Sequence, residues 1–197
     1  MRLSNCGMLA APDGEFAVKL AWLTDLHINF VRPDVFRAFL GELAACPADA
    51  FIITGDIGEA NTCALYLQTI AERAARPVHF VLGNHDFYHG SFADVHARVR
   101  ALTAVNKHLI WLRDAGVLDL SASTALLGHD GWGDARLGDF ERSQVLLNDF
   151  QLIDDLRLPR ECWREKLEVL GDEAGNHIRK HLPKALEAHP AAVLALH

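Results

Sequence analysis

The sequence predicts an α/β fold in which polar residues gather at the ends of the strands of a parallel sheet. Apolar strand-like runs alternate with helical periodicity through the first hundred residues, which indicates βαβ units. The first three runs each end in a cluster of Asp, Asn or His residues. The length of 197 residues suits one domain with a substantial core. In such sheets ligands bind at the carboxyl ends of the strands, where these clusters lie.

The first half of the chain predicts three strands and three helices in alternation. Short apolar runs place strands at residues 16–23, 50–54 and 77–82. Between the first two, a helix is expected at 33–45, because Pro33 suits a first helical position. The next helix begins after Asn61 or Thr62 and ends near residue 75. Ser91, with Asp94 three residues later, predicts the start of a third helix that ends near residue 106.

The second half is less regular. Short strands are expected near residues 117–120 and 124–127, followed by a glycine-rich loop at 128–134. Residues 138–158 predict irregular structure with some helix, and residues 161–188 a mostly helical segment. We expect breaks in that segment near Gly171 and Gly175, and a new turn or kink at Pro183. A last strand at 191–196 precedes His197.

Composition narrows the class of protein. The net charge of −7 argues against a broad basic surface, so nucleic acid is a less favoured partner. No segment approaches the roughly 18 apolar residues of a membrane span, so no membrane partner is expected. The four cysteines are scattered, which predicts free thiols in a reducing compartment. Because the first residues also lack the features of a signal peptide, we expect a cytoplasmic protein.

Three polar clusters carry the predicted chemistry. Asp25 and His27 follow the first strand at a spacing of two, which places both on one side of an extended segment. Asp56 follows the second strand, and its two oxygens can bridge two metal ions. Asn84 and His85 follow the third, offering a neutral carbonyl oxygen and a proton donor. Taken singly, the first two clusters are better explained as ordinary surface or turn residues.

The order D-x-H, G-D, G-N-H-D, with each motif closing a strand, resembles the calcineurin-like metallophosphoesterase family and its bacterial Ser/Thr phosphatase-like members. The resemblance covers residues 16–197 and leaves 1–15 as an N-terminal extension. It implies a four-layer metallophosphatase sandwich, with two mixed β-sheets flanked by helices. It also implies a two-metal site whose ligands are Asp25 and His27 for one ion, Asn84 and His197 for the other, and Asp56 bridging both.

The same resemblance assigns the catalytic residues. His85 is expected near the leaving group without binding metal, and Asp86 is expected to orient His85 through a hydrogen bond. The family pattern continues with a G-H-x-H motif beyond the position of His197, so we expect a site and a second sheet that are incomplete at the C-terminus. The segment Gly128–Arg136 is expected to be a loop at the rim. There, Trp132, Asp134 and Arg136 either contact substrate or belong to a structured turn with the tryptophan packed on the body.

The implied activity is hydrolysis of a phosphate ester by a hydroxide that two divalent metal ions activate. The Asp, His and Asn ligands suit Mn²⁺ best, with Fe or Zn²⁺ as alternatives, better than Ca²⁺. The motifs do not distinguish monoesters from diesters and carry no information on oligomeric state. Two other hypotheses stay open: an inactive member of the family that binds a protein, and a truncated product without a complete site.

Overall fold

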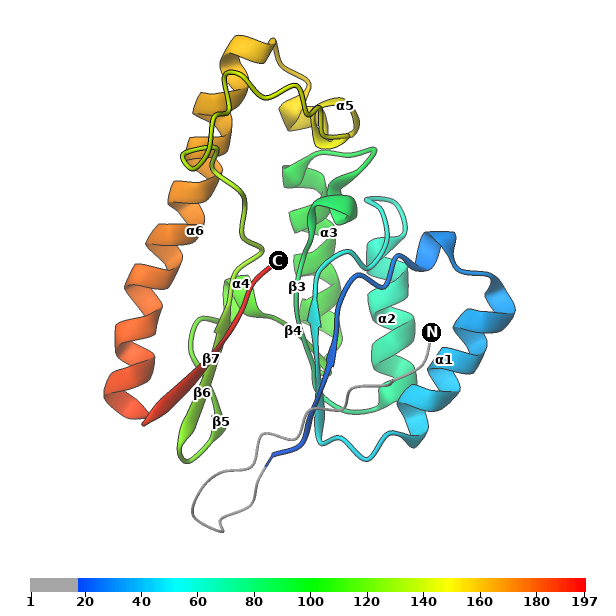
Figure 1. Cartoon of the computed structure of the whole chain (residues 1–197). Helices are drawn as coiled ribbons and strands as arrows, with labels where there is room; N and C mark the ends of the chain where they lie inside the picture. Colours follow the sequence, from blue (N-terminus) through cyan, green and yellow to red (C-terminus); the bar gives the residue numbers. More distant parts are fainter. Residues whose placement is uncertain (1–17) are drawn as a thin grey trace.

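The first sheet is parallel and carries the three motif loops. The computed structural model describes residues 18–197, so the expected extension at 1–15 and the start of the first strand lie outside the described part (Figure 1). Four strands, β1 (Leu20–Leu23), β2 (Ala50–Thr54), β3 (Val78–Val81) and β4 (Leu109–Trp111), pair in chain order. Because all four are parallel, the ends of β1, β2 and β3 meet at one edge of the sheet.

Helices connect these strands as the sequence predicts. They are α1 (Pro33–Ala45), α2 (Cys63–Ala74) and α3 (Phe92–Val105), with short 3₁₀ turns η1 (Ile28–Phe30) and η2 (Asn84–Phe87) at the motif loops. The side chain of Ser91 accepts a hydrogen bond from the backbone N–H of Asp94 at 3.1 Å, which confirms the predicted start of α3.

A second, smaller sheet lies beside the first. It contains β5 (Leu118–Ser121), β6 (Thr124–Gly128) and β7 (Ala191–Ala195). The β5–β6 pair is antiparallel and the β6–β7 pair is parallel, so this sheet is mixed. The prediction of an α/β fold with two sheets flanked by helices is confirmed, although among the described residues the first sheet is parallel throughout.

Alternating side chains divide the core into layers. In β2, Phe51 and Ile53 pack with the helices α1, α2 and α3, whereas Ile52 belongs to the cluster between the sheets. In β6, Leu126 joins that same cluster, whereas Leu127 packs against Ala185 of the long helix α6 (Arg160–Ala188). The order is therefore helices, sheet, sheet, helix, as Figure 1 shows with α6 and α1–α3 on opposite sides. The period-two alternation of a strand produces this arrangement.

Several local predictions were wrong. The three-residue strand β4 and the short helix α4 (Leu112–Ala115) were missed, because so short a run has no readable periodicity. The predicted breaks near Gly171 and Gly175 are absent, and α6 continues through Pro183 as one helix of 29 residues. Gly171 has a packing role instead, since a Cβ there would lie 2.3 Å from Cβ of Asp134.

The irregular segment contains two short elements, α5 (Asp149–Leu152) and the 3₁₀ turn η3 (Asp154–Leu156), in agreement with the prediction of some helix at 138–158. Among residues 18–197, no helix combines the length and apolar character that crossing a bilayer requires.

Candidate metal centre

Three loops bring the predicted residues together at the carboxyl edge of the first sheet. The backbone N–H of His27 donates to the carbonyl of Asp56 at 2.8 Å, and that of Ile28 donates to the carbonyl of Ile57 at 3.0 Å. Asp25, His27 and Asp56 have φ angles of 51°, 42° and 52°, in the left-handed region that non-glycine residues rarely adopt. Such backbone persists where the surrounding structure holds it, and it concentrates at functional sites.

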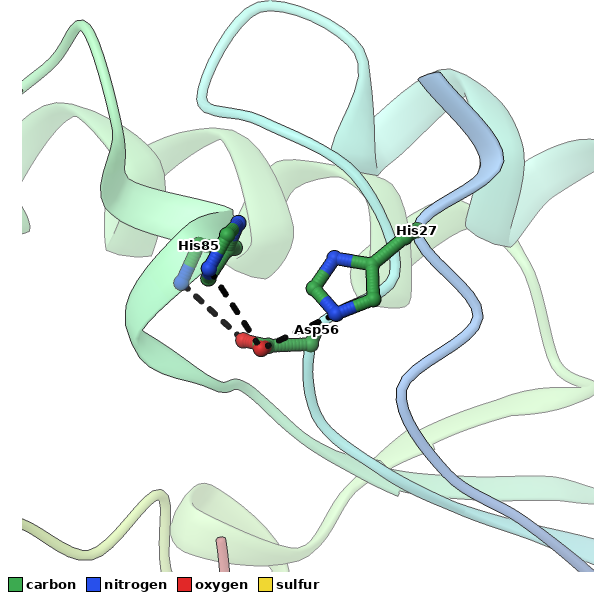
Figure 2. A group of neighbouring side chains, drawn as sticks. All are labelled: His27, Asp56 and His85. Atoms are coloured by element: carbon green, nitrogen blue, oxygen red, sulfur yellow. Dashed lines mark hydrogen bonds and ion pairs between the residues drawn. The ribbon is translucent and has the colours of Figure 1, made fainter. Parts of the chain in front are cut away.

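Asp56 is the centre of the site. Its carboxylate is buried, and its Oδ2 lies 3.5 Å from Nε2 of His27 and 4.0 Å from Nε2 of His85 (Figure 2). Its Oδ1 lies 3.4 Å from Nε2 of His197 and accepts a hydrogen bond of 3.0 Å from the backbone N–H of His85. The two oxygens therefore face two different sets of side chains.

These side chains form two groups that could each hold a metal ion. In the first, ligand atoms of His27, Asp56 and His85 lie within 4.8 Å of one another, and in the second the same holds for Asp25, Asp56 and His197. Asp56 belongs to both groups, which is the arrangement a bridging carboxylate needs. The grouping differs from the one expected by resemblance, because Asp25 lies with His197 and His85 lies with His27.

Other features of the site fit a metal centre. Nδ1 of His27 and Nδ1 of His85 are buried and have no hydrogen-bond partner, so these rings have donor capacity that the protein does not use. A Cβ on Gly83 would lie 2.2 Å from Oδ1 of Asp56, so glycine leaves the space that this carboxylate occupies. Imidazole nitrogens mixed with carboxylate oxygens suit Mn, Fe or Zn ions.

Asn84 lies beside this centre and is held by two residues that the sequence motifs did not indicate. Its side-chain Nδ2 is 2.8 Å from Oδ1 of Asp149 and 3.3 Å from the hydroxyl of Tyr88. Asp149 is only 8% exposed and lies at the start of α5, more than sixty residues away along the chain. No strand ending or motif spacing marks this aspartate in the sequence.

The expected role of Asp86 is corrected by its hydrogen bonds. Its Oδ1 accepts from the backbone N–H groups of Ile57 and Gly58, both at 2.9 Å, and its Oδ2 accepts from that of Gly83 at 2.9 Å. Nδ1 of His85 has no partner, so Asp86 does not orient this ring by a hydrogen bond. Asp86 instead joins the second motif loop to the third, because its buried carboxyl satisfies backbone donors in both.

Burial also changes the pKa of Asp86. Removal from solvent raises the pKa of its carboxyl to about 7, with the nearby charge of Asp56 acting in the same direction. The backbone hydrogen bonds from Gly83 and Gly58 oppose this increase, because they favour the ionised form.

The loop at 128–136 lies at the rim, where its tryptophan is packed on the body, and contact with substrate stays a prediction. Trp132 packs edge-on against Phe92 at a ring distance of 5.3 Å, and it also lines a cavity of about 250 Å³ that Asn84 and His197 share. Arg136 is occupied in ion pairs with Asp134 and Asp172 at 2.7 and 2.9 Å.

Comparison with known families agrees with this geometry. A sequence model described as calcineurin-like phosphoesterase matches residues 18–189, which include the first three motifs but not His197. The chain belongs to the calcineurin-like phosphoesterase family. Among curated proteins, a search found no match to this member of the family.

Two solved structures share the fold of this phosphoesterase family member. The phosphopantetheinyl hydrolase PptH from Mycobacterium tuberculosis aligns with a TM-score of 0.65 at 16% identity, over 90% of this chain and 67% of that one. The protein TT1561 of Thermus thermophilus aligns with a TM-score of 0.55 at 13% identity, over 89% of this chain and 66% of that one. The chain thus spans about two thirds of each structure's length.

Proposed function

We propose that this protein hydrolyses phosphate esters with the help of two divalent metal ions held on either side of Asp56. The observation that carries the proposal is the pair of possible ligand groups that share this one buried carboxylate. Membership of the calcineurin-like phosphoesterase family supports the same chemistry. Of the hypotheses considered, an inactive scaffold is disfavoured, because the ligand candidates on the first three loops are present and converge.

The proposed ligands are Asp25, His27, Asp56, Asn84 and His197. When bound, two divalent ions supply Lewis-acid polarisation of the phosphate and lower the pKa of an attacking water. Manganese is our preferred metal, with Fe or Zn²⁺ as alternatives that the same nitrogen and oxygen donors accept. The free thiols of Cys46, Cys63 and Cys162 support a reducing location, which we propose is the cytoplasm.

His85 is the proposed catalytic residue for the leaving group. Its ring stacks on Tyr88 at a centroid distance of 4.2 Å and meets His27 edge-on at 4.5 Å, so it is held beside Asp56. A histidine placed in this way can donate a proton to the leaving oxygen. Because His85 also lies in one of the possible ligand groups, metal analysis of a His85 variant distinguishes the two roles.

A cavity adjoins the site beside Asn84 and His197, and its lining disfavours an anionic group there because it includes Asp130 and Asp149. Apolar side chains of Trp132, Phe150 and Leu167 line it, and its lining contains no lysine or arginine among the described residues. A polynucleotide needs cationic side chains along its backbone, so we do not propose a nuclease. The phosphopantetheinyl hydrolase among the structural neighbours acts, by its name, on a phosphopantetheinyl group, which supports testing organic phosphate esters first.

The test is hydrolysis of p-nitrophenyl phosphate and of bis-p-nitrophenyl phosphate with Mn²⁺ present. We expect Asp56→Asn to lower kcat/KM by at least about 100-fold, since the bridging oxygen is lost. Asp34→Asn, a matched change at an exposed position of α1, should leave it unaltered. Equal activity of Asp56→Asn and the unsubstituted protein would overturn the proposal. Bound metal without activity on either ester would favour the scaffold hypothesis.

A further inference from the structure

The side-chain amide of Asn84 is fixed by two neighbours on one side. Its Nδ2 donates to Oδ1 of Asp149 at 2.8 Å and to the hydroxyl of Tyr88 at 3.3 Å. The Tyr88 hydroxyl in turn donates to the same Oδ1 of Asp149 at 2.7 Å. Three buried or half-buried polar groups therefore satisfy one another in a closed set.

This set decides which end of the amide is free. An asparagine amide presents two hydrogen-bond donors on nitrogen and an acceptor on oxygen, and only the oxygen can bind a cation. A carboxylate accepts hydrogen bonds and does not donate them, so Asp149 selects the nitrogen of Asn84. With both donors of Nδ2 used, Oδ1 is the end that Asn84 can present to a ligand.

We propose that Asp149 is a positioning residue that turns Asn84 so that its carbonyl oxygen faces the second metal ion. This inference rests on the proposed two-metal function. It assigns to α5, an element without any recognised motif, a part in the metal centre.

The location of Asp149 is itself well determined by packing. The backbone N–H of His89 donates to the carbonyl of Leu152 at 2.7 Å, which ties α5 to the turn after Asn84. Phe150 stacks on Trp163 of α6 at a centroid distance of 3.9 Å and an angle of 12°. The carboxyl of Asp149 is thus held between two helical segments. A metal ligand is oriented by a hydrogen-bond partner whose own position is fixed in this way.

The same set reaches the proposed catalytic histidine. Tyr88 stacks on His85 while its hydroxyl is bonded to Asp149. Burial, followed by the hydrogen bond to Asp149, raises the pKa of the Tyr88 hydroxyl well above its ordinary value, so this group stays a donor to Asp149. Asp149 therefore supports the neighbouring residues Asn84 and His85 together.

The experiment measures Mn²⁺ binding to the whole chain by isothermal titration calorimetry. Removing the acceptor in Asp149→Leu should weaken one of the two bound ions by about 10- to 100-fold, the usual effect of losing a residue that orients a ligand. Asp154→Asn, an exposed aspartate five residues further along, should bind both ions normally. Asn84→Ala provides the reference for complete loss of this ligand.

The double variant decides whether Asp149 acts through Asn84. If it does, Asp149→Leu should cause no further loss of affinity in the Asn84→Ala background, whereas a general structural defect would add to it. Normal Mn²⁺ affinity in Asp149→Leu, with a weakened Asn84→Ala, would overturn the inference and leave the proposed function intact. Normal affinity in Asn84→Ala, or no Mn²⁺ binding by the unsubstituted protein, would instead overturn the proposed metal site.

Loss of folding is controlled by a second variant. Asp149→Asn keeps the shape of the side chain and also offers a donor, so that the Asn84 amide can turn either way. We expect this variant to bind one Mn²⁺ ion several-fold more weakly, with an unchanged unfolding temperature. If Asp149→Leu does not fold, unchanged affinity in a folded Asp149→Asn overturns the inference.

Discussion

Two strand ends in this protein have similar sequences and different roles. Residues 83–86 read Gly-Asn-His-Asp after β3 of the first sheet, and residues 128–130 read Gly-His-Asp after β6 of the second. In both, the aspartate is buried and accepts backbone hydrogen bonds. Asp86 binds N–H groups of two loops, and Asp130 binds the N–H of Leu82 at 2.8 Å and the indole N–H of Trp111 at 2.9 Å.

The histidines separate the two regions. Nε2 of His85 lies 4.0 Å from the carboxylate of Asp56, and its Nδ1 has no hydrogen-bond partner. Nδ1 of His129 accepts the backbone N–H of Gly131 at 3.0 Å, and its side chain is almost fully buried. The two histidines therefore differ in their partners: His85 lies by a carboxylate that follows the neighbouring strand β2, whereas the ring of His129 is held within its own loop.

The largest expected effect is that of His85→Ala. Losing a positioned proton donor should lower turnover of p-nitrophenyl phosphate by about 10²- to 10⁴-fold. Because we place His85 beside the leaving group, the two metal ions should still bind, as elemental analysis would measure. Loss of an ion from this variant would instead assign His85 as a metal ligand. It would contradict the family resemblance, which separates His85 from the metal ligands.

A smaller effect, on stability, is expected for Asp86→Asn. It tests whether a buried aspartate that accepts backbone hydrogen bonds, a feature of both regions, holds the loops together. The amide nitrogen cannot accept, so at least one buried backbone N–H loses its partner, at a cost of up to about 3 kcal/mol in the free energy of unfolding. Urea denaturation of metal-free protein measures this, with the exposed Glu165→Gln in α6 as control. An unchanged free energy of unfolding would show that Asp86 does not join the loops.

The smallest effect concerns His129 and depends on pH. Burial, followed by the charge of Arg113, lowers the pKa of His129 to about 3. Above the ordinary pKa of about 6.5 the ring is neutral in both states, but below it only the unfolded chain gains a proton. Stability is therefore lost as pH falls from about 6.5 toward 3, by up to about 2 kcal/mol at pH 5 from this residue.

His129→Asn removes that titration and keeps an acceptor for the backbone N–H of Gly131. The free energy of unfolding of this variant should fall less between pH 7 and pH 5 than that of the unsubstituted protein. Its hydrolytic turnover should be normal, in contrast to His85→Ala. An identical pH dependence in the two proteins would contradict the assignment of His129 as a buried neutral residue.

Strong local signals explain which elements could be predicted. The strands at Ala50–Thr54 and Val78–Val81 were found because they are mostly apolar and a glycine follows each within two residues. The helix start at Ser91 was found because its cap is local. β4 was missed because three residues have no period, and Gly171 of α6 misled because its role is to make room for Asp134 of another segment.

The sequence by itself determined the α/β order and the three motif loops, because each depends on residues close together in the chain, and its resemblance to a family suggested the five proposed ligands. Only the tertiary structure decided the rest. It placed Asp25 with His197 and His85 with His27, and it directed Asp86 to backbone amides. It also brought Asp149 to Asn84 across more than sixty residues. Contacts of this range follow from how sheets and helices pack, and no local pattern in the chain encodes them.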